Sequence, residues 1–190
     1  MRVPNAVHQA HPWVISEIAP DFGLLDAWSL PAYGAREDFE AFLHVASSFD
    51  PARSGSPLTR ALFALRFRLG AILGWDDAGP RPIPGCTETT LSVRLPAHLR
   101  GTGSRAAGGP GHGFVPLYQT DDEWAAELSN ATVHGVLQLA WVEEGRGRYR
   151  GRMGVYVKPR GLLGAAYLAA IQPFRHLVVY PALTSQLGRA

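Results

Sequence analysis

The feature that most constrains the fold is an alternation of apolar and polar residues that runs from position 123 to position 158. It divides into the segments 123–129, 133–142 and 149–158, which are separated by a turn at 129–132 and a glycine-containing turn at 143–148. Because successive side chains of a strand point to opposite faces of a sheet, this period of two predicts strands. A shorter apolar segment at 114–119 precedes them, and the short turns predict an antiparallel meander.

The alternation also predicts two unlike faces for this sheet. With Glu127 placed opposite His134 and Gln138 opposite Arg152, each side chain can be assigned to a face. The apolar face collects Trp124, Ala126, Leu128, Val133, Gly135, Leu137, Leu139, Trp141, Tyr149, Gly151, Met153, Val155 and Val157. The polar face collects Glu123, Glu127, Ser129, His134, Gln138, Arg150, Arg152, Tyr156 and Lys158. We expect such a sheet to be covered on its apolar side only.

The apolar C-terminal region supplies a candidate cover. From Gly161 it predicts a helix of about 25 residues that ends near Leu187 and is bent or interrupted at Pro173 and Pro181. One side of that helix carries Leu163, Tyr167, Ile171, Phe174 and Val178. Small residues stand on the surfaces that would meet: Ala126, Gly135, Gly151 and Ala170. The sequence therefore predicts an apolar cavity between sheet and helix.

The first half of the chain predicts mainly helices. A short strand is expected at 13–18, followed by helices at 21–30 and 36–47. A longer helix is expected to begin after Ser56 and Pro57 and to end at Gly74. Residues 76–113 are rich in proline and glycine and predict mostly loop. No stretch divides the chain into separately patterned halves, so we expect a single α+β domain over residues 1–190.

Composition narrows the class of protein. The chain is 46% hydrophobic with a formal charge of +2, which is typical of a globular protein. Cys86 is the one cysteine, so no intramolecular disulfide is expected and a reduced, cytoplasmic location fits best. The apolar stretch from Leu162 to Tyr180 is interrupted by polar residues, which predicts a buried helix and no membrane span. Lys158 is the one lysine among 18 basic residues, a bias that suggests a GC-rich bacterial genome.

Several chemistries lack their sequence signatures. The seven histidines show no metal-ligand spacing, so neither a metal nor a cofactor is expected. The glycine run at 101–113 lacks the Gly-Lys-Ser/Thr ending of a phosphate-binding loop. The basic run at 146–160 has no nucleic-acid-binding motif around it, so no nucleic-acid partner is expected.

Two groups of residues are candidates for chemistry. His134 and Glu127, with Arg152 and Tyr156, can form an acid/base and anion-binding cluster, or a solvated face with ordinary ion pairs. Arg175 and His176 interrupt the C-terminal helix, either as an anchor for a ligand anion or as partners of Asp121 or Glu123. The catalytic candidates are therefore His134, Glu127 and His176. The candidates for lining a ligand cavity are Tyr118, Trp124, Trp141, Met153, Tyr167, Phe174 and Arg175.

Some of these residues belong to segments with a family likeness. The segments are Asp121–Glu127, Thr132–Val136, Tyr149–Met153, Val157–Pro159, Gly161–Gly164, Ile171–His176 and Tyr180–Leu183. With them the chain resembles the bacterial domain-of-unknown-function family 2867 over nearly its whole length. The resemblance implies the START and Bet v 1-like helix-grip (SRPBCC) superfamily, in which a curved antiparallel sheet wraps around a long C-terminal helix with an apolar cavity between them.

Three functions follow as hypotheses. The first is binding of a hydrophobic small molecule, such as a lipid or a polyketide-like metabolite, in the internal cavity. The second is a cofactor-independent cyclase, dehydratase or isomerase that uses polar groups lining the same cavity. The third, implied by relatives in which this domain follows a dehydrogenase-type domain, is an accessory role for a dehydrogenase partner. One fold hosts many functions, so the sequence leaves the choice between an enzyme and a binding protein open.

Overall fold

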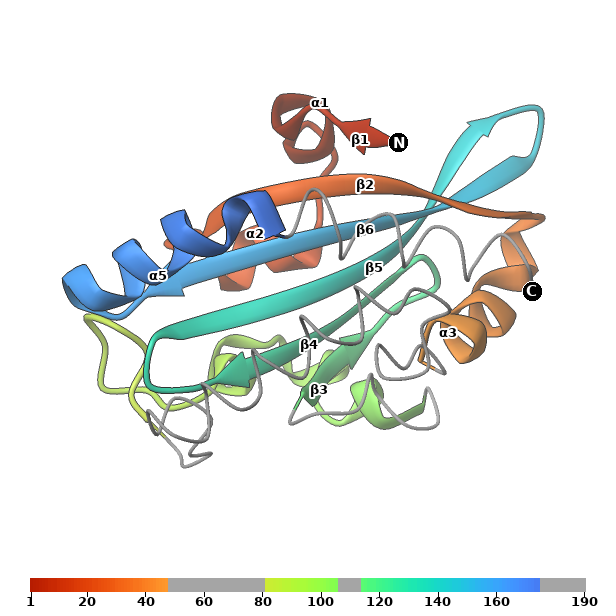
Figure 1. Cartoon of the computed structure of the whole chain (residues 1–190). Helices are drawn as coiled ribbons and strands as arrows, with labels where there is room; N and C mark the ends of the chain where they lie inside the picture. The colour runs from red at the N-terminus through yellow and green to blue at the C-terminus, as the bar shows by residue number, and fades with distance from the viewer. Residues whose placement is uncertain (48–80, 106–113, 175–190) are drawn as a thin grey trace.

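The computed structural model describes residues 1–47, 81–105 and 114–174. In this part of the chain a six-stranded antiparallel sheet has the order β1-β2-β6-β5-β4-β3 (Figure 1). The strands are β1 (Arg2–Val3), β2 (Gly23–Gly34), β3 (Val115–Gln119), β4 (Glu123–Ser129), β5 (Val133–Gly145) and β6 (Arg148–Pro159).

The predicted meander is confirmed as β4, β5 and β6, and the shorter segment expected at 114–119 is confirmed as β3 at the edge of the sheet. The assumed register is wrong by two residues at both turns. Glu127 pairs with Val136, and Gln138 pairs with Gly154. Because side chains alternate with a period of two, a shift of two residues leaves every side chain on its predicted face. The apolar and polar faces are therefore those read from the sequence.

The N-terminal region differs most from the prediction. The helix expected at 21–30 is wrong, because these residues belong to the 12-residue strand β2, which pairs along β6. The helical spacing of Leu24, Leu25 and Trp28 is overridden by this long-range pairing. The prediction of a strand at 13–18 is also wrong, because residues Val14–Ile18 form the short helix α2, which follows α1 (Asn5–Gln9).

Other local predictions are closer to the structure. The helix expected at 36–47 is confirmed as the 3-10 turn η1 (Arg36–Asp38) followed by α3 (Phe39–Ser47). Residues 81–105 are mainly loop, with the short 3-10 helices η3 (Leu91–Arg94), η4 (Ala97–Leu99) and η5 (Thr102–Arg105). The helix expected after Ser56 lies outside the described residues.

Both faces of the sheet are covered, so the expectation of a one-sided cover is wrong. On the apolar face, α3 packs Phe39, Phe42 and Leu43 against the sheet. The buried sheet residues of that cluster are Leu30, Trp124, Ala126, Leu139, Trp141 and Met153. On the polar face, the N-terminal segment and residues 81–105 bury a second core: Trp13, Ile15, Ile18, Ala19, Phe22, Ile83, Leu91, Leu95, Leu99, Leu117, Tyr118, Ala125, Val136, Ala140 and Tyr156.

The helix-grip architecture expected from the sequence is wrong. The described molecule is mostly a six-stranded sheet, and α5 (Gly161–Phe174) is a 14-residue helix that turns back beside β6 (Figure 1). Its first turn faces solvent, because Leu162 is 91% and Leu163 is 64% exposed. A sheet wrapped around α5 would bury both leucines. The predicted continuation to Leu187 lies outside the described residues.

Within the described residues, no helix is both long and apolar enough to cross a membrane.

Candidate functional site

Two carboxylates on the polar face organise the segments that cover it. Glu123 and Glu127 both belong to β4, and they are 2% and 5% exposed. A buried carboxylate is costly unless hydrogen bonds satisfy its oxygens. Both carboxylates are satisfied by donors from distant parts of the chain.

Glu123 holds the N-terminal segment. Its carboxylate accepts the backbone N–H groups of Val14 at 2.8 Å and Ile15 at 3.3 Å, which are the first two residues of α2. It also accepts the Tyr118 hydroxyl at 2.7 Å and Gln138 Nε2 at 2.7 Å. Burial raises the pKa of Glu123 even though these hydrogen bonds oppose the rise. Burial and the neighbouring Glu123 carboxylate raise the pKa of Tyr118. We call these five residues the Glu123 cluster.

His8 extends this network into α1. Its Nε2 lies 2.8 Å from Gln138 Oε1 and 3.0 Å from the Tyr156 hydroxyl, and its ring stacks on Trp13. Burial lowers the pKa of His8 to about 4, so the imidazole is neutral near pH 7. The backbone of Gly154 leaves room for this contact, because a Cβ there would lie 2.6 Å from Gln138 Oε1.

Glu127 holds the second covering segment. Its carboxylate accepts the Leu91 N–H at 3.0 Å, at the start of η3, and the hydroxyl of Thr90. His134 Nε2 lies 2.9 Å from the same carboxylate and donates to it. The structure thus brings together the catalytic candidates Glu127 and His134. It buries both beneath Leu91 and Phe22, where they act as a structural anchor.

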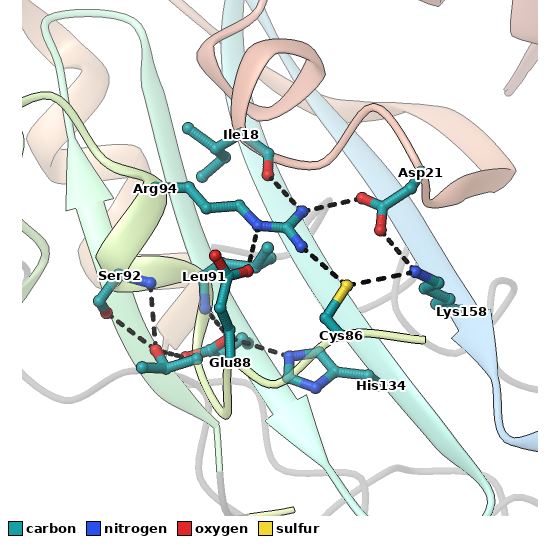
Figure 2. Close-up of polar contacts among 11 residues, drawn as sticks. Ile18, Asp21, Cys86, Glu88, Leu91, Ser92, Arg94, His134 and Lys158 are labelled. Atoms are coloured by element: carbon teal, nitrogen blue, oxygen red, sulfur yellow. Dashed lines mark hydrogen bonds and ion pairs between the residues drawn. The ribbon is translucent and has the colours of Figure 1, made fainter. Parts of the chain in front are cut away.

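An ion-pair cluster around Arg94 joins residues 81–105 to the segment before β2 and to β6 (Figure 2). The guanidinium contacts Glu88 at 2.7 Å, Asp21 at 2.9 Å, the Ile18 carbonyl at 3.1 Å and Cys86 Sγ at 3.3 Å. Lys158 joins from β6 by contacting Asp21, and its Nζ lies 3.9 Å from the same sulfur. Burial alone would raise the pKa of Asp21, but hydrogen bonds from Lys158 and Arg94 lower it.

This Arg94 cluster was missed by the sequence reasoning. Its members Asp21, Cys86, Glu88, Arg94 and Lys158 come from three separate segments, and residues 81–105 carry no periodic pattern.

The other predicted residues are dispersed. Trp124, Trp141 and Met153 do lie together on the apolar face, each at most 4% exposed, and Trp141 stacks on Phe42 at 5.2 Å. Tyr118 lies on the opposite face, as part of the Glu123 cluster.

The remaining candidates join neither group. Arg152 pairs with Ala140, whereas Tyr156 pairs with Val136, the residue that also pairs with Glu127. Arg152 therefore lies four positions along β6 from the level of the Glu127 carboxylate. Tyr167 and Phe174 belong to α5, and Arg175 and His176 lie outside the described residues.

One part of the apolar face is incompletely buried. Trp28, Leu137, Val155 and Val157 are each half-buried and come from the neighbouring strands β2, β5 and β6. Leu137 pairs with Val155, and Trp28 pairs with Met153 next to it. We call these four side chains the apolar patch.

The sequence matches a known protein family. The family described as "Protein of unknown function (DUF2867)" matches residues 18–182. The chain belongs to this DUF2867 family. No curated protein and no solved structure matches the chain significantly.

The DUF2867 match includes some of these clusters completely and others only in part. The matched residues contain all members of the Arg94 cluster and of the apolar patch. The match begins at Ile18, so it leaves out Val14 and Ile15 of the Glu123 cluster and also His8, which contacts Gln138 of that cluster. Among the described residues of this DUF2867 protein, no group of three or more His, Cys, Asp or Glu side chains is placed to hold a metal ion.

Proposed function

We propose that this DUF2867 protein binds a hydrophobic small molecule against the apolar face of its sheet. The observation that carries the proposal is the apolar patch, in which four large apolar side chains on three adjacent strands stay half-buried. A contiguous, incompletely buried apolar surface is typical of a ligand or partner site.

The surroundings of the patch favour an uncharged ligand. On β5 and β6 the residues that share its face include Val133, Gly135, Leu139, Trp141, Tyr149, Gly151 and Met153, and the charged Glu143 lies near the far end of β5. On β2, Asp26 lies opposite Val155, and its charge is compensated by an ion pair with Arg2. Gly135 leaves space beside the patch, since a Cβ there would meet only ordinary contacts, Val157 Cγ1 at 3.6 Å and the Tyr156 carbonyl at 3.7 Å. The Trp28 indole adds a large apolar surface.

The geometry does not favour the enzyme hypothesis in its original form. That hypothesis needs Glu127 and His134 to line the same cavity as the apolar residues, and the strands place them on the opposite face. An accessory role for a dehydrogenase partner stays a prediction. So do the bacterial source and the cytoplasmic location, the last supported by the lone Cys86. The helix-grip superfamily assignment loses its structural support, because the described residues do not form that architecture.

A dye titration tests the proposal. The fluorescent probe is 8-anilinonaphthalene-1-sulfonate, and dodecanol is the uncharged competitor. Val155→Thr keeps the shape of the side chain but places a hydroxyl in the patch, so dye affinity should fall about fivefold. Val115→Thr is the matched control, because Val115 is 58% exposed on the edge strand β3.

The expected result is saturable dye binding that dodecanol displaces and that the control leaves unchanged. Thermal melting of both variants separates lost binding from lost folding. Absence of saturable binding in a folded protein, or equal affinity for all three proteins, would contradict the proposal.

A further inference from the structure

The first turns of α5 present an apolar surface to solvent at one end of the sheet (Figure 1). Leu162 is 91% and Leu163 is 64% exposed, whereas Gly164 is buried close to the Thr132 carbonyl. At about 100° per residue, the exposed side chains form one continuous side of the helix, opposite Gly164. This α5 surface consists of Leu162, Leu163, Ala165, Ala166 and Ala169.

No charged residue interrupts α5. Its 14 residues contain no Asp, Glu, Lys or Arg. A surface helix of a globular protein normally carries charged and polar residues on its solvent side. Single exposed leucines are common, but a contiguous apolar surface of this kind marks a site of interaction with a partner or a membrane.

Two arginines lie beside the α5 surface. Arg160 directly precedes α5, and its guanidinium donates to the backbone carbonyls of Pro82 and Asn130. It also donates to the Ser129 hydroxyl at 2.8 Å. Burial and the nearby charge of Arg81 lower the pKa of Arg160, so the two guanidinium groups lie close together. Within the described residues, neither arginine forms an ion pair with a carboxylate.

This end of the molecule has a net positive charge. In the neighbouring Arg94 cluster, the charges of Arg94 and Lys158 balance those of Asp21 and Glu88 (Figure 2). Addition of the two arginines beside α5 gives four positive and two negative charges, a formal sum of +2. The loop that begins at residue 81 lies at the same end of the sheet as the start of α5 (Figure 1). Positive charge and exposed apolar side chains therefore occur together.

We propose that this end of the molecule binds the surface of an anionic phospholipid membrane. The α5 surface enters the boundary between headgroups and acyl chains, and Arg81 and Arg160 meet lipid phosphates. A guanidinium has five N–H donors, and Arg160 uses three of them within the protein, which leaves two for a phosphate. Interfacial helices bind membranes through buried apolar area together with basic residues, and both are present here.

Charge favours a lipid surface over a second copy of this chain. Two copies that met through the α5 surface would bring two ends of like charge together, which opposes association. Anionic headgroups instead attract the same positive charge.

Vesicle sedimentation of the full chain tests the proposal. The probes are vesicles made of equal parts phosphatidylglycerol and phosphatidylcholine, and vesicles of phosphatidylcholine alone. We expect binding to the mixed vesicles to be about tenfold tighter, because each basic residue near the surface adds attraction to anionic lipid. Added salt should weaken this binding.

Substitution of the two leucines tests the apolar contribution. The double variant Leu162→Ser, Leu163→Ser should weaken binding to the mixed vesicles at least about tenfold. The matched control is Val7→Ser, Val115→Ser, which changes side chains that are 55% and 58% exposed on α1 and β3. It should change the affinity by less than about twofold.

Substitution of an arginine tests the charge contribution. Arg81→Gln should weaken binding to the mixed vesicles about fivefold. Arg146→Gln, in the exposed turn between β5 and β6, removes the same charge and should change the affinity by less than about twofold. Arg160 is kept, because its guanidinium also holds Pro82 and Asn130. Thermal melting verifies that each variant is folded.

Four results would each overturn the proposal. The first is equal binding to both kinds of vesicle or to neither, and the second is an equal loss of affinity in the control variants. The third is a loss in Val155→Thr as large as that in the leucine variant, which would assign membrane binding to the apolar patch. The fourth is a lipid-free dimer in analytical ultracentrifugation that the leucine variant dissociates, since a second copy would then cover α5. Because Val155→Thr leaves the α5 surface intact, this inference and the proposed function fail separately.

Discussion

Glu123 and Glu127 lie four residues apart on one face of β4, and each carboxylate accepts backbone N–H from the start of a helix that covers that face, two groups for Glu123 and one for Glu127. Glu123 holds α2, and Glu127 holds η3. The free N–H groups of a helix start need acceptors, and a buried carboxylate needs donors, so each satisfies the other. The polar face of this sheet is therefore an interior surface.

Removal of the Glu127 carboxylate should destabilise the protein strongly. Glu127→Ala leaves the donors of Thr90, Leu91 and His134 without their acceptor in a buried site. The expected loss in the free energy of unfolding is about 3 kcal/mol. Urea denaturation measures it, with Glu17→Ala on the exposed face of α2 as a control that should change stability by less than about 0.5 kcal/mol. A loss below about 1 kcal/mol for Glu127→Ala would show that the carboxylate is not an anchor.

Stability should fall in mild acid because of His8. Burial lowers the pKa of its folded form from 6.5 to about 4, so between these values the unfolded chain binds more protons. The stabilising contribution is complete above pH 6.5 and is lost as the pH falls towards 4, by on the order of 3 kcal/mol. The pKa of Glu123 is raised, and its contribution therefore has the opposite sign.

The variant His8→Gln isolates the histidine from this background. The wild-type protein should be the more stable of the two at pH 7, and its advantage should shrink as the pH is lowered to about 4. Urea denaturation at a series of pH values measures this difference. A difference that does not change with pH would show that His8 titrates normally in the folded protein.

Gly154 and Gly135 should respond differently to an added methyl group. In Gly154→Ala the new Cβ would lie 2.6 Å from Gln138 Oε1 and 3.0 Å from His8 Nε2, so the expected loss of stability is about 2 kcal/mol. In Gly135→Ala the nearest atom is 3.6 Å away, so stability should change by less than about 1 kcal/mol. Thermal melting of the two variants compares them directly. Equal losses would contradict the packing described for the two faces.

Arg94 should not be replaceable by lysine. The guanidinium contacts Asp21, Glu88, the Ile18 carbonyl and Cys86 at once, whereas an ammonium group cannot span these partners. Arg94→Lys should therefore cost about 1–2 kcal/mol in the free energy of unfolding. Arg146→Lys, in the exposed turn between β5 and β6, is the matched control. If both substitutions prove neutral in urea denaturation, the Arg94 cluster does not stabilise the packing of residues 81–105 on the sheet.

Sequence pattern predicted the meander and its two faces because alternation is a local property of each strand. It did not predict the register, since a shift of two residues, as between Glu127 and Val136, leaves the alternation unchanged. The strand β2 was predicted as a helix because Leu24, Leu25 and Trp28 also fit a helical period, and only its pairing with β6 decides between the two.

The burial of the polar face could not be predicted from local pattern. Glu123, His134 and Gln138 have the composition of a solvated face, yet they are at most 2% exposed. Their cover comes from residues near 14 and near 91, far away in the sequence. For α5 the prediction fails in the other direction: its apolar composition predicted a buried helix, but Leu162 faces solvent.

Native mass spectrometry of the full chain tests the central claim, that the apolar face binds a hydrophobic small molecule. The purified protein is measured as isolated and after incubation with uncharged apolar compounds such as dodecanol, and each mass is compared with the denatured mass. The account predicts a bound species that is lost on denaturation and is reduced in Val155→Thr but not in Val115→Thr. A native mass equal to that of the bare chain in every sample would contradict it.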